Sequence, residues 1–148
     1  MAKPLPRTRY CTRRRARQGI LLAEAIAWLI LGPALLRLFP FQRLLPPLCR
    51  AETEGEWIVT QRQQQMAIEV GHALVHGNRA LPWRSSCLVL AFAGAMMLRR
   101  RDVPYILYLG ARMGDERLAA HAWLRSGPVM VAGGDGERDY AVVGTFAG

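Results

Sequence analysis

The sequence feature that most limits how this chain can fold is the run from Leu88 to Leu98, which contains no polar residue. Pro82 and the pair Ser85-Ser86 come just before it, and this pattern predicts a helix that starts at about Cys87. Three arginines, Arg99–Arg101, follow the run and complement the negative end of a helix dipole. A helix that is apolar nearly all round is buried on every side, so we expect this one at the centre of the fold.

Two further helices are expected before the central one. Residues 18–38, rich in Ala and Leu, predict the first. The second is predicted over residues 57–76, where Val70 and Leu74 lie one helical turn apart and Gly77-Asn78 is a typical helix end.

Strands are expected after Pro104, where the helical pattern stops. Short turn signals, Met113–Glu116 and Ser126–Pro128, divide this part of the chain. The predicted strands are 105–109, 118–125, 129–132 and 140–146. Helices first and a small antiparallel sheet last define an α+β fold, and 148 residues suit one domain.

The charge of the chain is concentrated at its start. The formal net charge is +9, and residues 1–50 hold ten of the twenty basic residues but one acidic residue, Glu24. We therefore divide the chain into a basic flexible arm, 1–17, and a single domain, 18–148. A basic arm suits an anionic surface or an acidic partner, but it has no interleaved aromatic residues beyond Tyr10, so we expect no nucleic-acid binding.

Residues 20–39 are apolar enough to raise the question of a membrane span. Glu24 and Arg37 are charged, and Gly32-Pro33 is expected to interrupt the helix. A core helix, or a helix that lies on a membrane surface, is therefore favoured over a span. The three cysteines form no disulfide pattern, so we expect a cytoplasmic protein, with peripheral membrane association left open.

Cys87 and His121 are the residues best suited to chemistry. Cys87 would sit in the first turn of the central helix, where free N–H groups and the dipole favour a thiolate. In the strand predicted over 118–125, alternation places His121 and Trp123 on one face. An imidazole beside a thiolate is the usual activating pair of cysteine nucleophiles. Taken alone, Cys87 is better explained as a small core residue and His121 as a hydrogen-bonded histidine in a sheet.

Carboxylates that could orient the imidazole lie in the loop after the third strand. Asp135 is favoured slightly over Asp139, and both are also ordinary turn residues. His72 and His76 are spaced i, i+4 on a helix, but no third ligand accompanies them, so we interpret them as ordinary helix residues. We expect neither a metal nor a cofactor.

Four short stretches occur in a recognisable order: Leu81–Leu88, Leu98–Pro104, Leu109–Arg112 and Ala120–Trp123. Together with the apolar helix before them, they resemble the transglutaminase-like leader peptidase of lasso-peptide biosynthesis, the catalytic half of the B protein, here as a stand-alone chain. The resemblance covers residues 18–146. It implies a papain/transglutaminase-like core in which Cys87 is the nucleophile and His121 the general base.

The resemblance also implies a reaction and partners. The reaction is cleavage of a ribosomally made precursor peptide between leader and core, with a small leader-recognition protein that delivers the precursor and an ATP-dependent cyclase that closes the ring. In one respect the chain departs from the family, which often has its Asp about 12 residues after the His. Here that position is Gly133, and the nearest Asp is Asp135.

Two other functions fit the same sequence. A non-catalytic, membrane-associated small protein would act through helix 20–39 and would not need Cys87 and His121 to converge. Acyl transfer to an amine would use the same thioester as hydrolysis.

Overall fold

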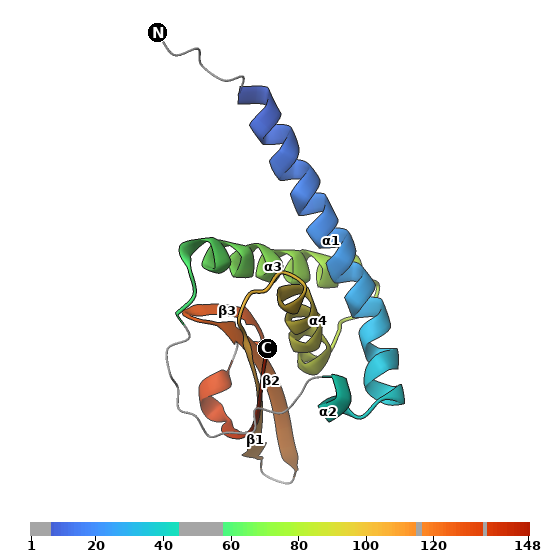
Figure 1. Cartoon of the computed structure of the whole chain (residues 1–148). Helices are drawn as coiled ribbons and strands as arrows, with labels where there is room; N and C mark the ends of the chain where they lie inside the picture. The colour runs from blue at the N-terminus through green and yellow to red at the C-terminus, as the bar shows by residue number, and fades with distance from the viewer. Residues whose placement is uncertain (1–6, 45–57, 115–116, 135) are drawn as a thin grey trace.

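The computed structural model describes residues 7–44, 58–114, 117–134 and 136–148. Three long helices precede a four-stranded sheet, as Figure 1 shows. In chain order the elements are α1 (Arg7–Leu38), α2 (Phe41–Leu44), α3 (Gln61–Ala80), α4 (Cys87–Arg99), β1 (Ile106–Met113), β2 (Leu118–Ser126), β3 (Val129–Ala132), the 3-10 turn η1 (Glu137–Asp139) and β4 (Ala141–Ala147). The predicted α+β class is confirmed.

Helix α4 is the centre of the core. Eight of its 13 residues are buried, and α1, α3 and the sheet enclose it (Figure 1). Leu29 of α1, Leu74 of α3 and Leu124 of β2 belong to the same buried cluster. The helix begins with Ser86 as its N-cap, whose side chain accepts a hydrogen bond from the Val89 amide. The apolar run therefore folds as its composition predicts.

The sheet is antiparallel throughout, in the order β3-β2-β1-β4. Its two faces differ. Leu107, Ala122 and Leu124 point toward α4 and belong to the core. Their neighbours along the strands, Tyr108 and Trp123, lie opposite each other in the register and stack with ring centroids 5.4 Å apart. These two aromatic side chains thus lie on the face of the sheet that is turned away from α4.

Three helix boundaries differ from the sequence-based expectations, among them the start of α3, which lies at Gln61 after its N-cap Thr60 and not at residue 57. Helix α1 begins at Arg7, so residues 7–17 are helical where an arm was expected, and it continues through Pro33. Arg, Ala and Gln are good helix formers, and burial of Leu29 and contact of Gly32 with Val89 hold the helix against α4. Helix α3 passes Gly77, which is buried against α1, and ends only at Ala80.

One ion-pair cluster joins α1 to the end of α4. Glu24 is bonded to Arg100 (2.9 Å) and to Arg101, and its side chain is only 10% exposed. Burial raises the pKa of Glu24, but the hydrogen bond and charge of Arg101, with help from Arg100, outweigh that effect and lower it below the ordinary value of 4.5. The one acidic residue of the apolar helix is therefore ionised and fully paired.

Among the described residues, α1 is the one helix whose length and composition would allow it to cross a membrane. The helix packs on α3 and α4 through Leu21, Ala25 and Leu29, each almost completely buried. The side of α1 that faces α3 and α4 is therefore part of the core, as expected from the sequence.

We expect Glu24→Gln to lower the free energy of unfolding by about 2 kcal/mol at neutral pH, because it leaves the guanidinium of Arg101 without its partner. Asp139→Asn is the control: it removes a carboxylate from the exposed contact with Arg112 and should cost less than about 0.5 kcal/mol. Urea denaturation measures both, and equal losses would contradict the role of the buried cluster.

The same pair gives a pH dependence. Since the pKa of Glu24 is lowered in the folded state, its contribution to stability is complete above the unfolded value of 4.5 and is lost as the pH falls through the folded value. Stability of Glu24→Gln should therefore fall less steeply below pH 4.5 than that of the unmodified chain. Parallel curves from urea titrations across this range would show that Glu24 contributes nothing.

Candidate active site

Cys87 opens the central helix and is held there by a short, well-defined loop. The side-chain oxygen of Asn78, near the end of α3, accepts a hydrogen bond from the Ser85 amide at 2.9 Å. Ser86 then caps α4, and Cys87 is its first residue. These two interactions fix the path of the chain into α4, so the position of Cys87 is set by backbone contacts on both sides.

The Cys87 thiol is free and half-buried, and it packs against the edge of the core cluster. It lies at the positive end of a 13-residue helix whose first N–H groups have no partner within the helix. This position offers the Cys87 N–H as a donor to a developing oxyanion.

His121 lies near the middle of β2, opposite Gly110 of β1. Its ring is 5.9 Å from Trp123 and 5.1 Å from Tyr140, centroid to centroid. A side chain at Gly110 would collide with Trp123 and Tyr140 at less than 3 Å, so glycine is what allows the aromatic rings to lie flat on β1 here. His121 is therefore held by aromatic neighbours, on the face predicted from strand alternation.

The His121 ring has one hydrogen bond, and it determines the tautomer. Nε2 lies 2.7 Å from the carbonyl oxygen of Gly133. A carbonyl accepts only, so Nε2 carries the proton and donates it. Nδ1 is then the basic nitrogen, and no partner for it is found among the described residues. This is the arrangement that a general base needs, with one nitrogen anchored and the other free.

The geometry of Gly133 explains why its carbonyl can reach His121. Its φ is +74°, and a Cβ at this position would lie 2.3 Å from the Ala122 oxygen and 2.9 Å from Trp123 Cα. Only glycine fits so close to β2 in this conformation. Gly133 follows β3 at the point where the β2–β3 pairing, which covers Leu124 to Ser126, has ended.

Cys87 and His121 lie at the same end of the molecule. Leu124 of β2 packs against Gly94 of α4. The chain that leaves the C-terminal end of α4 reaches Pro104, whose carbonyl accepts a hydrogen bond from the Ser126 hydroxyl at the end of β2, so α4 and β2 run in the same direction. Counting back from Gly94 to Cys87 gives about 10 Å along the helix. Counting back from Leu124 to His121 gives about 10 Å along the strand, in the same direction.

The two side chains do not meet in this structure. In the part of the chain that is described, Cys87 and His121 share no hydrogen bond. Ala122 and Leu124 face α4, whereas His121 leaves β2 on the other face, toward Tyr140. In Figure 1, α4 and η1 accordingly lie on opposite sides of the sheet. His121 stands where β2 has no strand partner on its β3 side, so the route between the two side chains runs around this edge.

The two carboxylates considered as the third member have different outcomes. Asp135 lies outside the described residues. Asp139 ends η1 with its side chain 65% exposed, and its nearest charged partner is Arg112, at 4.0 Å. Arg112 in turn lies over the ring of Tyr140. Asp139 therefore contacts Arg112, which covers Tyr140, and is not paired with His121. The hydrogen-bond partner of His121 Nε2 is the Gly133 carbonyl.

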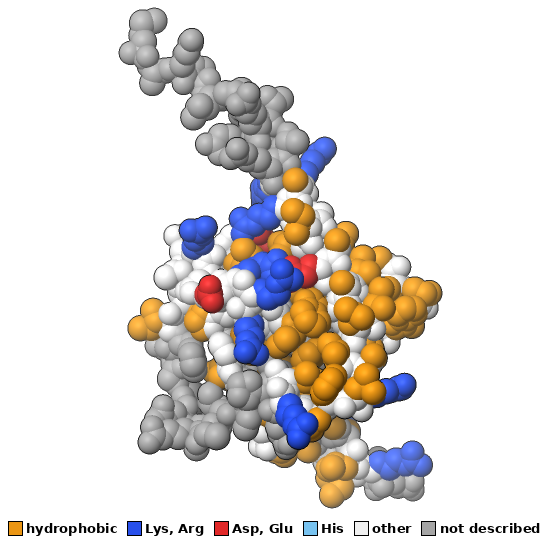
Figure 2. All heavy atoms as spheres, turned by 45° about the vertical axis from the view of Figure 1, so that its right-hand side comes forward, with side chains coloured by type: hydrophobic (Ala, Val, Ile, Leu, Met, Phe, Trp, Pro, Cys, Tyr) orange, Lys and Arg blue, Asp and Glu red, His pale blue; other side chains and the backbone are white. Residues whose placement is uncertain are grey.

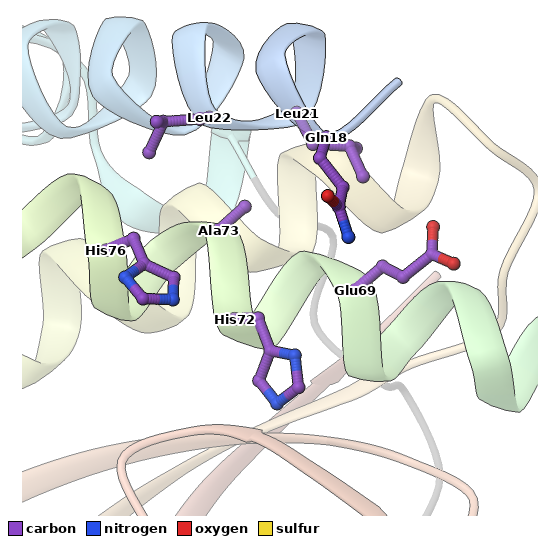
Figure 3. Close-up of a pocket in the computed structure, with 7 residues that line it drawn as sticks. All are labelled: Gln18, Leu21, Leu22, Glu69, His72, Ala73 and His76. Carbon is purple, nitrogen blue, oxygen red and sulfur yellow. The ribbon is translucent and has the colours of Figure 1, made fainter. Parts of the chain in front are cut away.

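His72 and His76 lie elsewhere, on α3. With Gln18, Leu21, Leu22, Glu69 and Ala73 they line a cleft of about 220 Å³ between α1 and α3 (Figure 3). The Glu69 carboxylate points away from both rings and pairs with Arg17 at 3.3 Å. In the described ranges no three His, Cys, Asp or Glu side chains converge as metal ligands.

Comparison with known proteins defines the class. A sequence model of the transglutaminase-like superfamily matches residues 28–145, which include α4, the whole of β2 and most of β4. The chain belongs to the transglutaminase-like superfamily. No curated protein and no solved structure matches it.

Sequence reasoning missed two features of this site, the Gly133 carbonyl and Tyr140. A partial signal existed for the first, because Gly133 occupies the position 12 residues after His121 where the resemblance leads one to look for an Asp. A main-chain acceptor leaves no mark in residue identity. The one indirect sign in the sequence is the glycine itself, because the positive φ at residue 133 favours glycine.

We expect Gly133→Ala to lower the free energy of unfolding by about 2 to 4 kcal/mol, because it combines strain with a backbone collision. Gly136→Ala is the matched control: φ is +84°, but the nearest atom to a Cβ is 3.9 Å away, so it should cost about 1 kcal/mol. Urea denaturation compares them. Equal losses would mean that the close approach of Gly133 to β2 does not exist in solution.

Proposed function

We propose that this chain is a cysteine peptidase that removes the leader from a ribosomally made lasso-peptide precursor, with Cys87 as nucleophile and His121 as general base. The observation that carries the peptidase part is the His121–Gly133 bond, which leaves Nδ1 as a basic nitrogen at the end of the sheet where α4 presents Cys87. Membership of the transglutaminase-like superfamily over residues 28–145 supports a thiol nucleophile and a histidine base in one domain. The lasso-peptide substrate rests on the sequence resemblance.

The proposed mechanism uses four groups. His121 Nδ1 takes the thiol proton, and the Cys87 sulfur attacks the carbonyl carbon of the scissile bond. The Cys87 N–H donates to the oxygen that becomes negative. The imidazolium then gives its proton to the leaving amine, and water hydrolyses the thioester. The Gly133 carbonyl accepts from Nε2–H throughout and stabilises the positive ring.

For this mechanism the two side chains must come together when substrate binds. Hydrogen bonds in an active site without substrate are often long or not yet formed. A shift of the Leu81–Ser86 loop and the first turn of α4 toward β2 would close the gap while His121 keeps its hydrogen bond to the Gly133 carbonyl. We therefore propose that substrate binding brings Cys87 and His121 together. In this complex an extended peptide would lie along the edge of β2 on the N-terminal side of Leu124, where β2 is not paired with β3.

Asp135 keeps its proposed role as the carboxylate that supports the imidazolium. It follows Gly133 by two residues, so it can act next to the carbonyl and not in place of it. Asp139 is the control for this assignment, because it is bound to Arg112.

Mass spectrometry of a lasso precursor incubated with its leader-recognition protein tests the proposal. The unmodified chain should release a leader fragment, and Cys87→Ala and His121→Gln should lower the rate by at least about 100-fold. Substitution of Cys11 or Cys49 by Ala gives the matched control and should leave cleavage unchanged. Equal cleavage by Cys87→Ala would exclude Cys87 as the nucleophile.

The carboxylates can be separated in the same assay. We expect Asp135→Asn to slow cleavage about tenfold or more and Asp139→Asn to leave it within about twofold, because Asp135 is two residues from Gly133 in the sequence and Asp139 is paired with Arg112. The opposite order would transfer the supporting role to Asp139.

Two alternatives give different products. Acyl transfer would appear in the same spectra as a leader joined to an added amine in place of a free acid. A non-catalytic, membrane-associated protein would give no fragment with any precursor, while Cys87→Ala and the unmodified chain would behave alike.

A further inference from the structure

The outer side of α1 is apolar and uncovered. Its inner side packs on α3 and α4, but the opposite side is a line of exposed residues that we call the outer stripe: Ile20, Ala23, Ala27, Ile30, Leu31, Ala34 and Leu38. Between residues 20 and 36 every exposed residue of α1 is apolar. At 1.5 Å per residue the stripe is about 27 Å long. Ile20, Ile30, Leu31 and Leu38 are between 49% and 74% exposed, which is unusual for large apolar side chains.

Basic residues border the outer stripe at both ends. Arg14, Arg15 and Arg17 are exposed before it, and Arg37 and Arg43 are exposed at and after its end. Figure 2 shows hydrophobic side chains gathered on this side of the molecule, with Lys and Arg at the margins. The one acidic residue of α1, Glu24, is turned inward to Arg100 and Arg101. The exposed outer residues of α1 are therefore apolar or basic, and its one carboxylate is neutralised by Arg100 and Arg101.

We infer that the outer stripe is a docking surface for an anionic lipid bilayer, on which α1 lies in the plane of the membrane surface. Apolar side chains would enter the boundary between headgroups and acyl chains, while the arginines reach anionic headgroups. Arg17 is paired with Glu69, which leaves four arginines for the lipid. Each basic residue near an anionic surface contributes about 1 kcal/mol, so these four add substantially to the apolar term.

Charge argues against a second copy of this chain as the occupant. A parallel copy would place Arg14, Arg15 and Arg17 against the same residues, and an antiparallel copy would place them against Arg37 and Arg43. Apart from the existing pair of Arg17 with Glu69, neither arrangement provides a carboxylate among the described residues of α1 to neutralise them. Anionic lipid does.

Packing argues against a transmembrane span. Leu21, Ala25 and Leu29 are buried against protein along one side of α1, and the Glu24 cluster ties the same side to α4. A span would have to break these contacts and carry an unpaired carboxylate into hydrocarbon. A helix lying on the surface keeps them, and the part of α1 that projects beyond the body leaves its basic end accessible (Figure 1).

Vesicle flotation with the full chain tests the inference. Vesicles of phosphatidylcholine and phosphatidylglycerol at 3:1 should carry the protein to the top of the gradient, and pure phosphatidylcholine vesicles should bind it at least about tenfold more weakly. The double variant Ile30→Ser/Leu31→Ser should lose at least about tenfold in affinity for the anionic vesicles. Val142→Ser/Val143→Ser, which removes equally exposed apolar residues from β4, is the matched control and should bind normally.

Circular dichroism melts establish that the variants are folded, and precursor cleavage in solution stays independent of the result. Equal binding by Ile30→Ser/Leu31→Ser and the control, or equal binding to both lipid mixtures, would overturn the inference. So would a concentration-dependent dimer, detected by sedimentation equilibrium without lipid, that the Ile30→Ser/Leu31→Ser variant abolishes. That last result would assign the stripe to a second copy.

Discussion

Helix α4 has no polar side to turn toward water, and the other elements are arranged so that they cover it. Leu29 from α1, Leu74 from α3 and Leu124 from β2 meet around it, which fixes the order of layers. Its start is fixed as well, because Ser86 caps it and Asn78 holds the preceding loop. Burial of one helix thus places a single thiol, Cys87, at a defined point on the surface of the core.

The second half of the candidate site is organised by the opposite face of the sheet. Trp123 stacks on Tyr108, Tyr140 closes over Gly110, and His121 is held between these rings and the Gly133 carbonyl. Strand β2 contributes to both the core and this set of aromatic residues, but through its two opposite faces. Under the proposed mechanism, chemistry that uses both would take place at the edge of β2, beyond the residues Leu124 to Ser126 that pair with β3.

The element order and nearly all strand boundaries could be predicted, because the Leu88–Leu98 run, the turn residues and strand alternation are local signals. The end of α1 at Leu38 could also be predicted, but the helical state of residues 7–17 could not. The continuity of α1 through Pro33 could not be predicted either, since it depends on contacts with α4 that lie far away in sequence. The same limit applies to the site. Cys87 and His121 were candidates from residue type and spacing, whereas the Gly133 carbonyl is a main-chain group that no residue pattern encodes. Whether Cys87 and His121 act together stays a prediction.

The most direct test of that pairing needs no substrate: the rate at which iodoacetamide alkylates each cysteine at pH 6, followed by peptide mass spectrometry. If His121 activates the thiol, Cys87 should react faster than Cys11 and Cys49, and His121→Gln should lower its rate by about tenfold or more while the other two cysteines keep theirs. An unchanged Cys87 rate in folded His121→Gln would show that the imidazole and the thiol do not cooperate, and the proposed catalytic pair would have to be abandoned.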